Sequence, residues 1–218
     1  MNPVRPRPRP ARIYAIADAA ALAPASLPAA VAAMAGAGIE WIQLRAKSLP
    51  GRDLYGLAEA CRRALAGSGS VLWIDDRADV AALLPGACLH LGQSDLPAAA
   101  AREVVGDAPW IGVSTHAAAE LAAADSDPAV DVVAVGPIFP TSGKERPEPV
   151  VGLSLLRWAR ARTAKPLIAI GGIDAGNVAQ VLAAGADSAA VLGAVYRGNA
   201  GDIGDIGENC RRLLAAAG

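Results

Sequence analysis

Short apolar runs alternate with longer alanine-rich stretches along almost the whole chain, and this alternation restricts the folds open to it. Eight such runs occur, each about as long as a β-strand, and most are apolar at every position. Strands that are buried on both faces are typical of a parallel sheet covered by helices. The runs span residues 12–17, 39–44, 70–74, 87–91, 110–113, 131–135, 166–170 and 188–192.

The stretches between the runs are rich in alanine, leucine and arginine, which favour helix. Eight strands, each followed by a helix, predict a compact (β/α)8 barrel, also called a TIM barrel, as a single domain over residues 12–218. An open doubly wound sheet is the alternative, but it does not explain why polar residues follow each run. We expect helices over residues 26–37, 50–66, 77–84, 97–105, 116–125, 152–163, 174–185 and 203–217.

The composition excludes several classes of protein. The 218 residues are 53% hydrophobic and carry a formal net charge of -1, which gives no electrostatic case for binding nucleic acid or an anionic membrane. No apolar run reaches the ~18 residues that a transmembrane helix needs. Residues 1–11 are rich in arginine and proline and predict a disordered tail. The widely spaced Cys61, Cys88 and Cys210 predict buried thiols in a reduced, cytoplasmic protein.

A group of cations follows the second apolar run, where a barrel of this kind has its active site. Gln43, Arg45 and Lys47 alternate along the chain, so an extended strand directs them to one face. Two cations directed into the mouth of a barrel need an anion between them, and Lys144 would add a third cation. Three positive groups suit a pyrophosphate. The alternative interpretation of these cations is that they simply lie in solvent at the end of a strand.

Carboxylates and glycines follow the other runs. Asp76 and Asp95 come after the third and fourth runs, and two carboxylates beside a phosphate are typical of Mg²⁺. The alternative is that each aspartate caps the next helix. Gly171-Gly172 and Gly193-Ala194 follow the last two runs, where backbone N–H groups of this fold commonly bind a phosphate. Tight turns are the alternative there.

These residues together predict a transfer between two phosphorylated small molecules, with pyrophosphate as the leaving group. The sequence shows no G-x-G-x-x-G cofactor fingerprint and no cysteine after a run that would serve as a nucleophile. His116, shortly after the fifth run, is the one well-placed histidine, and we interpret His90, within an apolar run, as structural.

An ordered set of motifs resembles the thiamine-phosphate synthase family, from about Arg12 to the last predicted helix. The resemblance implies a TIM barrel that joins 4-amino-5-hydroxymethyl-2-methylpyrimidine diphosphate to the phosphate of hydroxyethylthiazole. Thiamine phosphate and pyrophosphate would be the products. The motifs are YAIAD (14–18), QLRAK (43–47), DDRADVA (75–81), HLGQSDL (90–96), IGVSTH (111–116), GPIFPTSGK (136–144) and IAIGGI (168–173).

The resemblance also implies a role for each candidate residue. Mg²⁺ is expected at Asp76 and Asp95, and the thiazole phosphate at Gly172, Gly193 and Ala194. The expected catalytic residues are Arg45, Lys47, Ser114 and Lys144. The expected contacts of the pyrimidine diphosphate are Gln43, Arg45, Lys47, Asp75, Ser114, Thr141, Ser142 and Lys144.

The sequence departs from the family pattern at two positions near the diphosphate, and the last run also ends in Leu-Gly-Ala, where the family often has a serine. Asp75 stands where the family usually has asparagine, which places an extra negative charge beside the diphosphate. Gly143 stands where the family usually has a second threonine, so one hydroxyl is lost, and Ser142 offers a replacement.

Two other functions stay open. The related thiazole tautomerases share this barrel, and His116 would serve one as acid and base. A barrel that binds thiamine phosphate without turnover is the second alternative. The alanine- and leucine-rich outer helices also suit packing of the barrel as a homo-oligomer.

Overall fold

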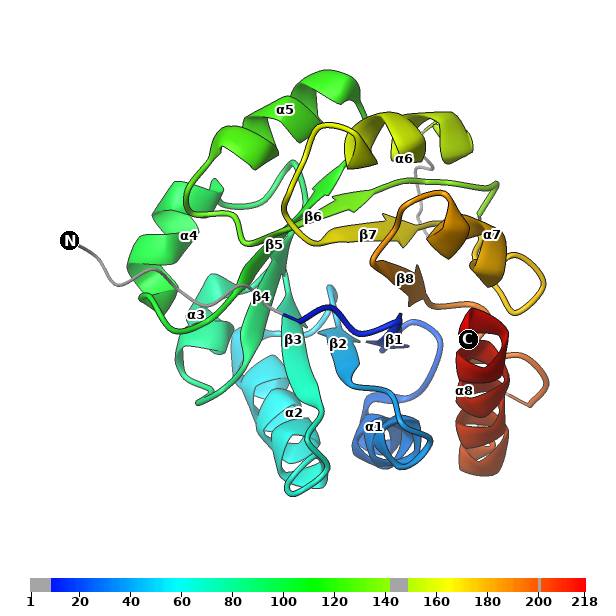
Figure 1. The fold of residues 1–218 in the computed structure, drawn as a ribbon. Coiled ribbons are helices and arrows are strands. Elements are labelled where there is room, and N and C mark those ends of the chain that lie inside the picture. Colours follow the sequence, from blue (N-terminus) through cyan, green and yellow to red (C-terminus); the bar gives the residue numbers. More distant parts are fainter. Residues whose placement is uncertain (1–8, 142–148, 200) are drawn as a thin grey trace.

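Eight parallel strands pair in chain order, and the last pairs with the first, so the sheet closes into a barrel (Figure 1). A computed structural model describes residues 9–141, 149–199 and 201–218. The predicted (β/α)8 barrel is confirmed, and the open doubly wound sheet is wrong because such a sheet has two unpaired edges. The strands are β1 (Ile13–Asp18), β2 (Trp41–Arg45), β3 (Val71–Asp75), β4 (Cys88–Leu91), β5 (Ile111–Thr115), β6 (Val132–Val135), β7 (Leu167–Ile170) and β8 (Ser188–Val191).

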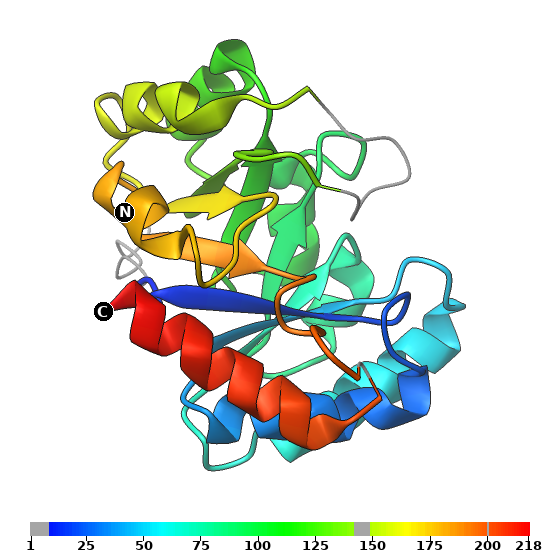
Figure 2. The same cartoon turned by 90° about the vertical axis from the view of Figure 1, so that its right-hand side faces the viewer.

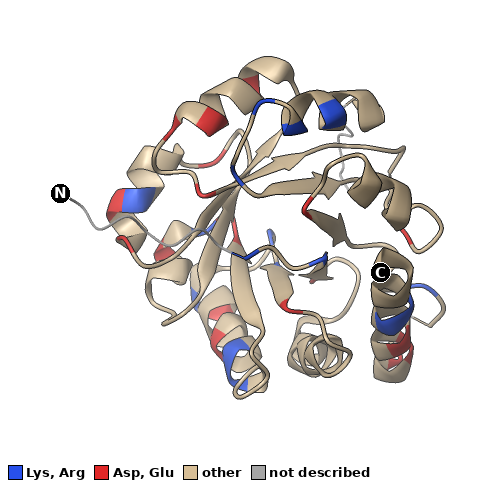
Figure 3. Cartoon of the chain, in the orientation of Figure 1, with Lys and Arg blue, Asp and Glu red and all other residues tan. Residues whose placement is uncertain are grey.

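Helices cover the outside of the barrel, and Figure 2 shows α8 and α1 along the same side of it. Within the described ranges, no helix has the length and apolar character needed to cross a membrane. Charges of both signs occur on the outer helices (Figure 3). The helices are α1 (Leu27–Gly36), α2 (Gly51–Ala64), α3 (Ala78–Ala82), α4 (Ala98–Val105), α5 (Ala118–Ser126), α6 (Gly152–Arg160), α7 (Val178–Ala183) and α8 (Ile203–Ala217), and a 3₁₀ turn (Pro24–Ser26) precedes α1.

The largest error in the predicted helices concerns α7, which begins at Val178 rather than at residue 174. Asp174 and Asn177 form a turn in place of the first helical residues. The Asp174 carboxylate accepts the Gly176 N–H at 2.8 Å, and Asn177 Oδ1 accepts the Asp174 N–H at 2.9 Å. Short polar side chains that bond nearby backbone in this way compete with helix formation.

The apolar side chains form one layer inside the barrel and another between the strands and the helices. In β1, Tyr14 and Ile16 belong to the inner layer, whereas Ile13 and Ala15 belong to the outer one. This division follows from the alternation of side chains along a strand. Every position of β1 is therefore buried, which explains why its sequence reads as a continuous apolar run.

The three cysteines lie in these apolar layers, as the sequence predicts. Cys61, Cys88 and Cys210 are buried and free of disulfides. Burial raises the pKa of Cys61 and Cys210 to about 12 and that of Cys88 to about 11. All three therefore stay neutral thiols that pack as small apolar groups.

A largely buried ion pair lies at the end of the barrel where the strands begin. Asp131, which directly precedes β6, accepts the Ile111 N–H at 2.8 Å and a hydrogen bond from Arg102 Nη2 at 2.6 Å. The carboxylate thus ties the start of β5 to α4. Both side chains of the pair are only 12% exposed.

We expect Asp131→Asn to lower the free energy of unfolding by about 3 kcal/mol, because the charge of Arg102 loses its carboxylate partner and keeps only backbone carbonyl acceptors. Asp187→Asn is the matched control. Asp187 bonds the Leu167 N–H and Arg160 in the same way, but the two side chains of that ion pair are 36% and 30% exposed. Urea unfolding followed by tryptophan fluorescence measures both losses. Equal losses of unfolding free energy in the two variants would show that burial does not strengthen the Asp131–Arg102 pair.

Candidate active site

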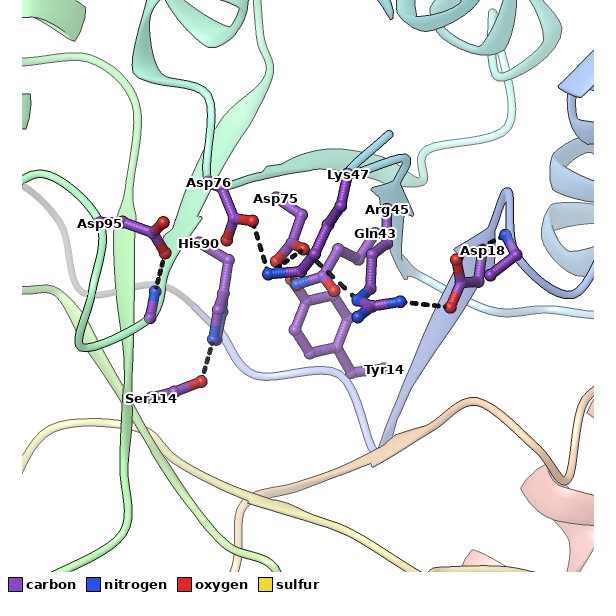
Figure 4. Close-up of polar contacts among 12 residues, drawn as sticks. Tyr14, Asp18, Gln43, Arg45, Lys47, Asp75, Asp76, His90, Asp95 and Ser114 are labelled. Carbon is purple, nitrogen blue, oxygen red and sulfur yellow. Dashed lines mark hydrogen bonds and ion pairs between the residues drawn. The ribbon is translucent and has the colours of Figure 1, made fainter. Parts of the chain in front are cut away.

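A row of alternating carboxylates and cations lies in the mouth of the barrel, at the C-terminal ends of the first strands (Figure 4). Asp18 Oδ2 is 2.6 Å from Arg45 Nη1. Asp75 Oδ2 lies 3.7 Å from Arg45 Nε and 3.9 Å from Lys47 Nζ. Lys47 Nζ is in turn 2.7 Å from Asp76 Oδ2. We call Asp18, Arg45, Asp75, Lys47 and Asp76 the charge row.

Strand register brings the charge row together. The pairing of β1 with β2 sets Asp18 beside Arg45, and both are the last residues of their strands. Gln43 lies deeper in the barrel, where its Nε2 donates to Tyr14 Oη at 3.0 Å. Lys47 lies beyond β2 and reaches back to the carboxylates. Gln43, Arg45 and Lys47 thus all face the barrel axis, in agreement with their predicted alternation (Figure 4).

The protonation of the charge row follows from its burial. Burial raises the pKa of the Asp75 carboxyl to about 7, and the charge of Asp76 adds to this rise. The charges of Lys47 and Arg45 oppose the rise without cancelling it. Burial lowers the pKa of Lys47, but its hydrogen bond to Asp76 and the nearby carboxylates outweigh burial and leave the pKa raised. Lys47 therefore stays protonated, whereas Asp75 binds a proton more readily than an ordinary aspartate.

Asp76 has an unusual backbone conformation for a residue with a side chain. Its φ of 64° lies in the left-handed region, and its N–H donates to the His90 carbonyl at 2.8 Å. Aspartate and asparagine tolerate this conformation better than most residues, although it still costs free energy. The left-handed turn lets the chain leave β3 with the Asp76 carboxylate directed at Lys47 (Figure 4).

The alternative interpretation of Asp76 and Asp95, that each caps the next helix, is wrong. The residues before α3 and α4 are Arg77 and Pro97, and neither helix has a side-chain cap. Asp95 Oδ2 instead accepts the Gly92 N–H at 2.7 Å. Burial, followed by a hydrogen bond with the Asp76 carboxyl, raises the pKa of Asp95. The two carboxyl groups therefore meet each other rather than a helix end.

The carboxylate oxygens of Asp76 and Asp95 suit a hydrated divalent cation. Asp76 and Asp95 place two carboxyl groups side by side next to the charge row, within reach of one ion. In the described part of the chain, no cluster of three or more His, Cys, Asp or Glu residues is placed to hold a metal. Two carboxylates leave room for water and substrate oxygens, which is the coordination that Mg²⁺ prefers.

His90 is a further candidate site residue, which the sequence analysis did not single out. Its ring faces the barrel interior, with Nε2 3.0 Å from Ser114 Oγ, and it packs against Tyr14. The interpretation of His90 as structural, based on its apolar neighbours, overlooked the alternation of the strand. The register pairs His90 with Asp75 on one side and with Gly112 on the other. A Cβ at Gly112 would lie 2.8 Å from His90 Nδ1, so the glycine makes room for the ring.

His116 lies on the loop after β5, as its position in the sequence predicts. Its Nδ1 is 2.6 Å from the Gly136 carbonyl, and its backbone N–H donates to Glu120 Oε2 at 2.6 Å. The ring is thereby held against the segment that follows β6.

The loops after β7 and β8 lie next to each other, because the two strands pair. Gly172 has a φ of 65°, and a Cβ there would lie 2.6 Å from the Pro140 carbonyl, so this position needs glycine for the close turn. A Cβ at Gly193 would meet nothing within 4 Å. Within the described ranges, the backbone N–H groups of Gly172, Gly193 and Ala194 have no hydrogen-bond acceptor in the protein. The loops thus combine a tight turn with donors that an anion would satisfy.

Some predicted residues fall outside the described part of the chain. Thr141 is the last described residue before the segment 142–148, so the roles predicted for Ser142 and Lys144 are untested, as is the loss of a hydroxyl at Gly143. The first eight residues of the predicted tail also lie outside it, whereas Ala11 is buried against the barrel.

Sequence comparisons identify similar proteins over most of the chain. A family model described as thiamine monophosphate synthase matches residues 13–195. The thiamine-phosphate synthase of Acidothermus cellulolyticus is 43% identical over 196 residues, which cover 88% of this chain and 89% of that protein. The thiamine-phosphate synthase of Thermobifida fusca is 41% identical over 215 residues, covering 98% and 97%.

Solved structures agree with these matches. The thiamine phosphate pyrophosphorylase from Pyrococcus furiosus is 29% identical, with a TM-score of 0.81, and the match covers 94% of this chain and 95% of that one. The thiamine phosphate pyrophosphorylase from Bacteroides thetaiotaomicron has a TM-score of 0.69 at 17% identity and shows the shared fold.

Proposed function

The chain belongs to the thiamine monophosphate synthase family, and we propose that it joins 4-amino-5-hydroxymethyl-2-methylpyrimidine diphosphate to hydroxyethylthiazole phosphate. Thiamine phosphate and pyrophosphate are the products. The observation that carries the proposal is the presence of two different anion-binding arrangements at one end of the barrel. The charge row supplies cations, and the loops after β7 and β8 supply backbone N–H groups. Two phosphorylated substrates need two such sites.

The diphosphate binds at Arg45 and Lys47 in this proposal. A guanidinium offers several N–H donors in one plane, which suits two phosphate oxygens, and an ammonium acts as a compact charge. The Ser114 hydroxyl, oriented by His90, faces the same mouth (Figure 4). Gln43 lies below these groups, at the depth where the pyrimidine ring would sit. Thr141, Ser142 and Lys144 complete the predicted contacts.

Asp76 and Asp95 would hold Mg²⁺ next to the diphosphate. Their facing carboxyl groups support this assignment. A bound Mg²⁺ would neutralise charge on the diphosphate oxygens and make pyrophosphate a better leaving group.

The reaction begins with cleavage of the bond between the pyrimidine methylene carbon and the diphosphate oxygen, whose electron pair leaves with pyrophosphate. The aminopyrimidine ring delocalises the resulting cation, and the thiazole nitrogen then donates its electron pair to the methylene carbon. Arg45 and Lys47 stabilise the charge that develops on the leaving group. The apolar side chains inside the barrel, Tyr14, Ile16 and Ile168 among them, would keep water from the cation.

The thiazole phosphate binds at the backbone N–H groups of Gly172, Gly193 and Ala194. Their lack of protein acceptors and the open space at Gly193 support this placement. Binding there places the second substrate at the same barrel end as the first, and this positioning supplies much of the rate.

Asp75→Asn is expected to lower the KM for the pyrimidine diphosphate by about threefold to tenfold, because a carboxylate that faces Arg45 and Lys47 competes with the diphosphate for both. An amide of the same size keeps the packing and removes the charge. Steady-state kinetics at saturating thiazole phosphate measure the change. An unchanged or higher KM would show that Asp75 does not oppose binding.

A coupling assay tests the function directly. Purified protein, Mg²⁺ and the two substrates are mixed, and thiamine phosphate is detected after oxidation to its fluorescent thiochrome form. Product that disappears with EDTA is the expected result. Folded protein that gives no product would overturn the proposal, and a tautomerase assay and calorimetry with thiamine phosphate would then separate the two remaining alternatives.

A further inference from the structure

Asp18 is a buried carboxylate that the proposed reaction has not used. It ends β1 and is 4% exposed. Its Oδ1 accepts the Ala20 N–H at 2.9 Å, and its Oδ2 accepts a hydrogen bond from Arg45 Nη1 at 2.6 Å. Both carboxylate oxygens are therefore engaged, and one of them fixes a cation in the mouth of the barrel.

The contact with Asp18 orients the Arg45 guanidinium. Among the described residues, Nη1 makes the one hydrogen bond of this group, while Nε approaches Asp75 only to 3.7 Å. A guanidinium carries five N–H donors in a plane. With Nη1 held by Asp18, the edge formed by Nε and Nη2 can donate to a second, bidentate partner. Two oxygens of a diphosphate match that edge.

Tyr196 contacts Asp18 from the segment after β8, the strand that pairs with β1. Its phenol oxygen accepts the Asp18 N–H at 2.9 Å. Burial raises the pKa of Tyr196 to about 12, so the phenol stays neutral. This contact fixes the Asp18 backbone where β1 ends, and with it the carboxylate that holds Arg45.

We propose that Asp18 is a positioning residue, which holds Arg45 by one nitrogen so that its Nε–Nη2 edge, which makes no hydrogen bond within the described residues, donates to the diphosphate of the first substrate. This role rests on the proposed function, because it assumes that Arg45 binds the diphosphate. Asp18 does not touch the substrate itself, and it acts through the orientation of the guanidinium.

Asp18→Asn tests the role, because the amide keeps the size of the side chain and an oxygen for the Ala20 N–H but loses the charge that holds Arg45. We expect the Kd for inorganic pyrophosphate, measured by titration calorimetry with Mg²⁺, to rise about tenfold, as for other residues that orient a binding group. The KM for the pyrimidine diphosphate rises with it, while the KM for the thiazole phosphate stays unchanged. Tyr196→Phe is expected to change pyrophosphate affinity in the same direction by less.

Asp131→Asn is the matched control, since Asp131 forms a similarly short and buried pair with Arg102 at the opposite end of the barrel. It is expected to lose stability but to bind pyrophosphate like the wild type. If Asp18→Asn also loses only stability and keeps its pyrophosphate affinity, Asp18 is structural and the proposal is overturned.

A double-mutant cycle keeps the test decisive if Asp18→Asn folds poorly. Arg45→Ala with Asp18→Asn removes both charges, and it is expected to bind pyrophosphate as weakly as Arg45→Ala alone, because Asp18 acts only through Arg45. A further loss in the double variant would overturn the positioning role. Wild-type protein that binds no pyrophosphate would overturn the proposed function itself.

Discussion

Asp76→Asn is expected to lower kcat by about a hundredfold to a thousandfold, which is the size of effect seen when one group that stabilises developing charge is removed. Asp76 carries the carboxylate that meets both Lys47 and Asp95. Asparagine is the informative replacement, because it tolerates the left-handed φ of 64° at this position, whereas alanine would add backbone strain. The amide keeps the side-chain shape and removes the negative charge that would hold Mg²⁺.

Two measurements check this prediction. The thiochrome assay across a range of Mg²⁺ concentrations gives kcat, and calorimetry of Mg²⁺ binding in the presence of pyrophosphate gives a readout independent of turnover. Asp79→Asn is the matched control, since Asp79 lies three residues further along, is 61% exposed and pairs with Arg77. The control should behave like the wild type. Full Mg²⁺-dependent activity in Asp76→Asn would show that the metal assignment is wrong.

Lys47→Gln is expected to lower kcat/KM for the pyrimidine diphosphate by about a hundredfold, because a cation that faces the leaving group is lost. The effect should be specific to catalysis. The Lys47 side chain is 53% exposed, so its ion pair with Asp76 contributes at most about 1 kcal/mol to folding. The KM for the thiazole phosphate should stay close to that of the wild type, since that substrate binds at the loops after β7 and β8.

Lys165→Gln is the control for this change. Lys165 donates to the Ala124 and Asp127 carbonyls, away from the mouth, just before β7. Its loss should reduce stability, measured by urea unfolding, and leave kcat/KM of the folded protein unchanged. If both variants lose activity in proportion to stability, Lys47 has no special role in binding the diphosphate.

The barrel itself could be predicted from local patterns. A strand buried on both faces reads as an unbroken apolar run, and eight such runs separated by helix-forming stretches have few other ways to bury their surfaces. The alternation of side chains also placed Arg45 and Gln43 on one face. The start of α7 could not be predicted in the same way, because a turn at Asp174 and Asn177 replaces the residues that helix propensity favours.

The side chains that line the mouth of the barrel were only partly predictable from the sequence. Arg45, Lys47, Asp76 and Asp95 stood out because charged groups directly follow apolar runs. His90 did not stand out, because its neighbours in the sequence are apolar and the polar partner of its ring, Ser114, comes 24 residues later. Nothing local distinguishes a histidine that packs in a core from one that faces a barrel mouth.

The sequence by itself determined the closed barrel and the end of it at which charges gather, because both depend on patterns within single strands and their immediate continuations. Only the tertiary structure decided that Asp18 holds Arg45, that Asp75 lies between Arg45 and Lys47, and that Asp76 meets Asp95. These contacts join different strands or the loops that follow them. They depend on the register of neighbouring strands and on burial around each carboxylate, which arise only when the barrel closes.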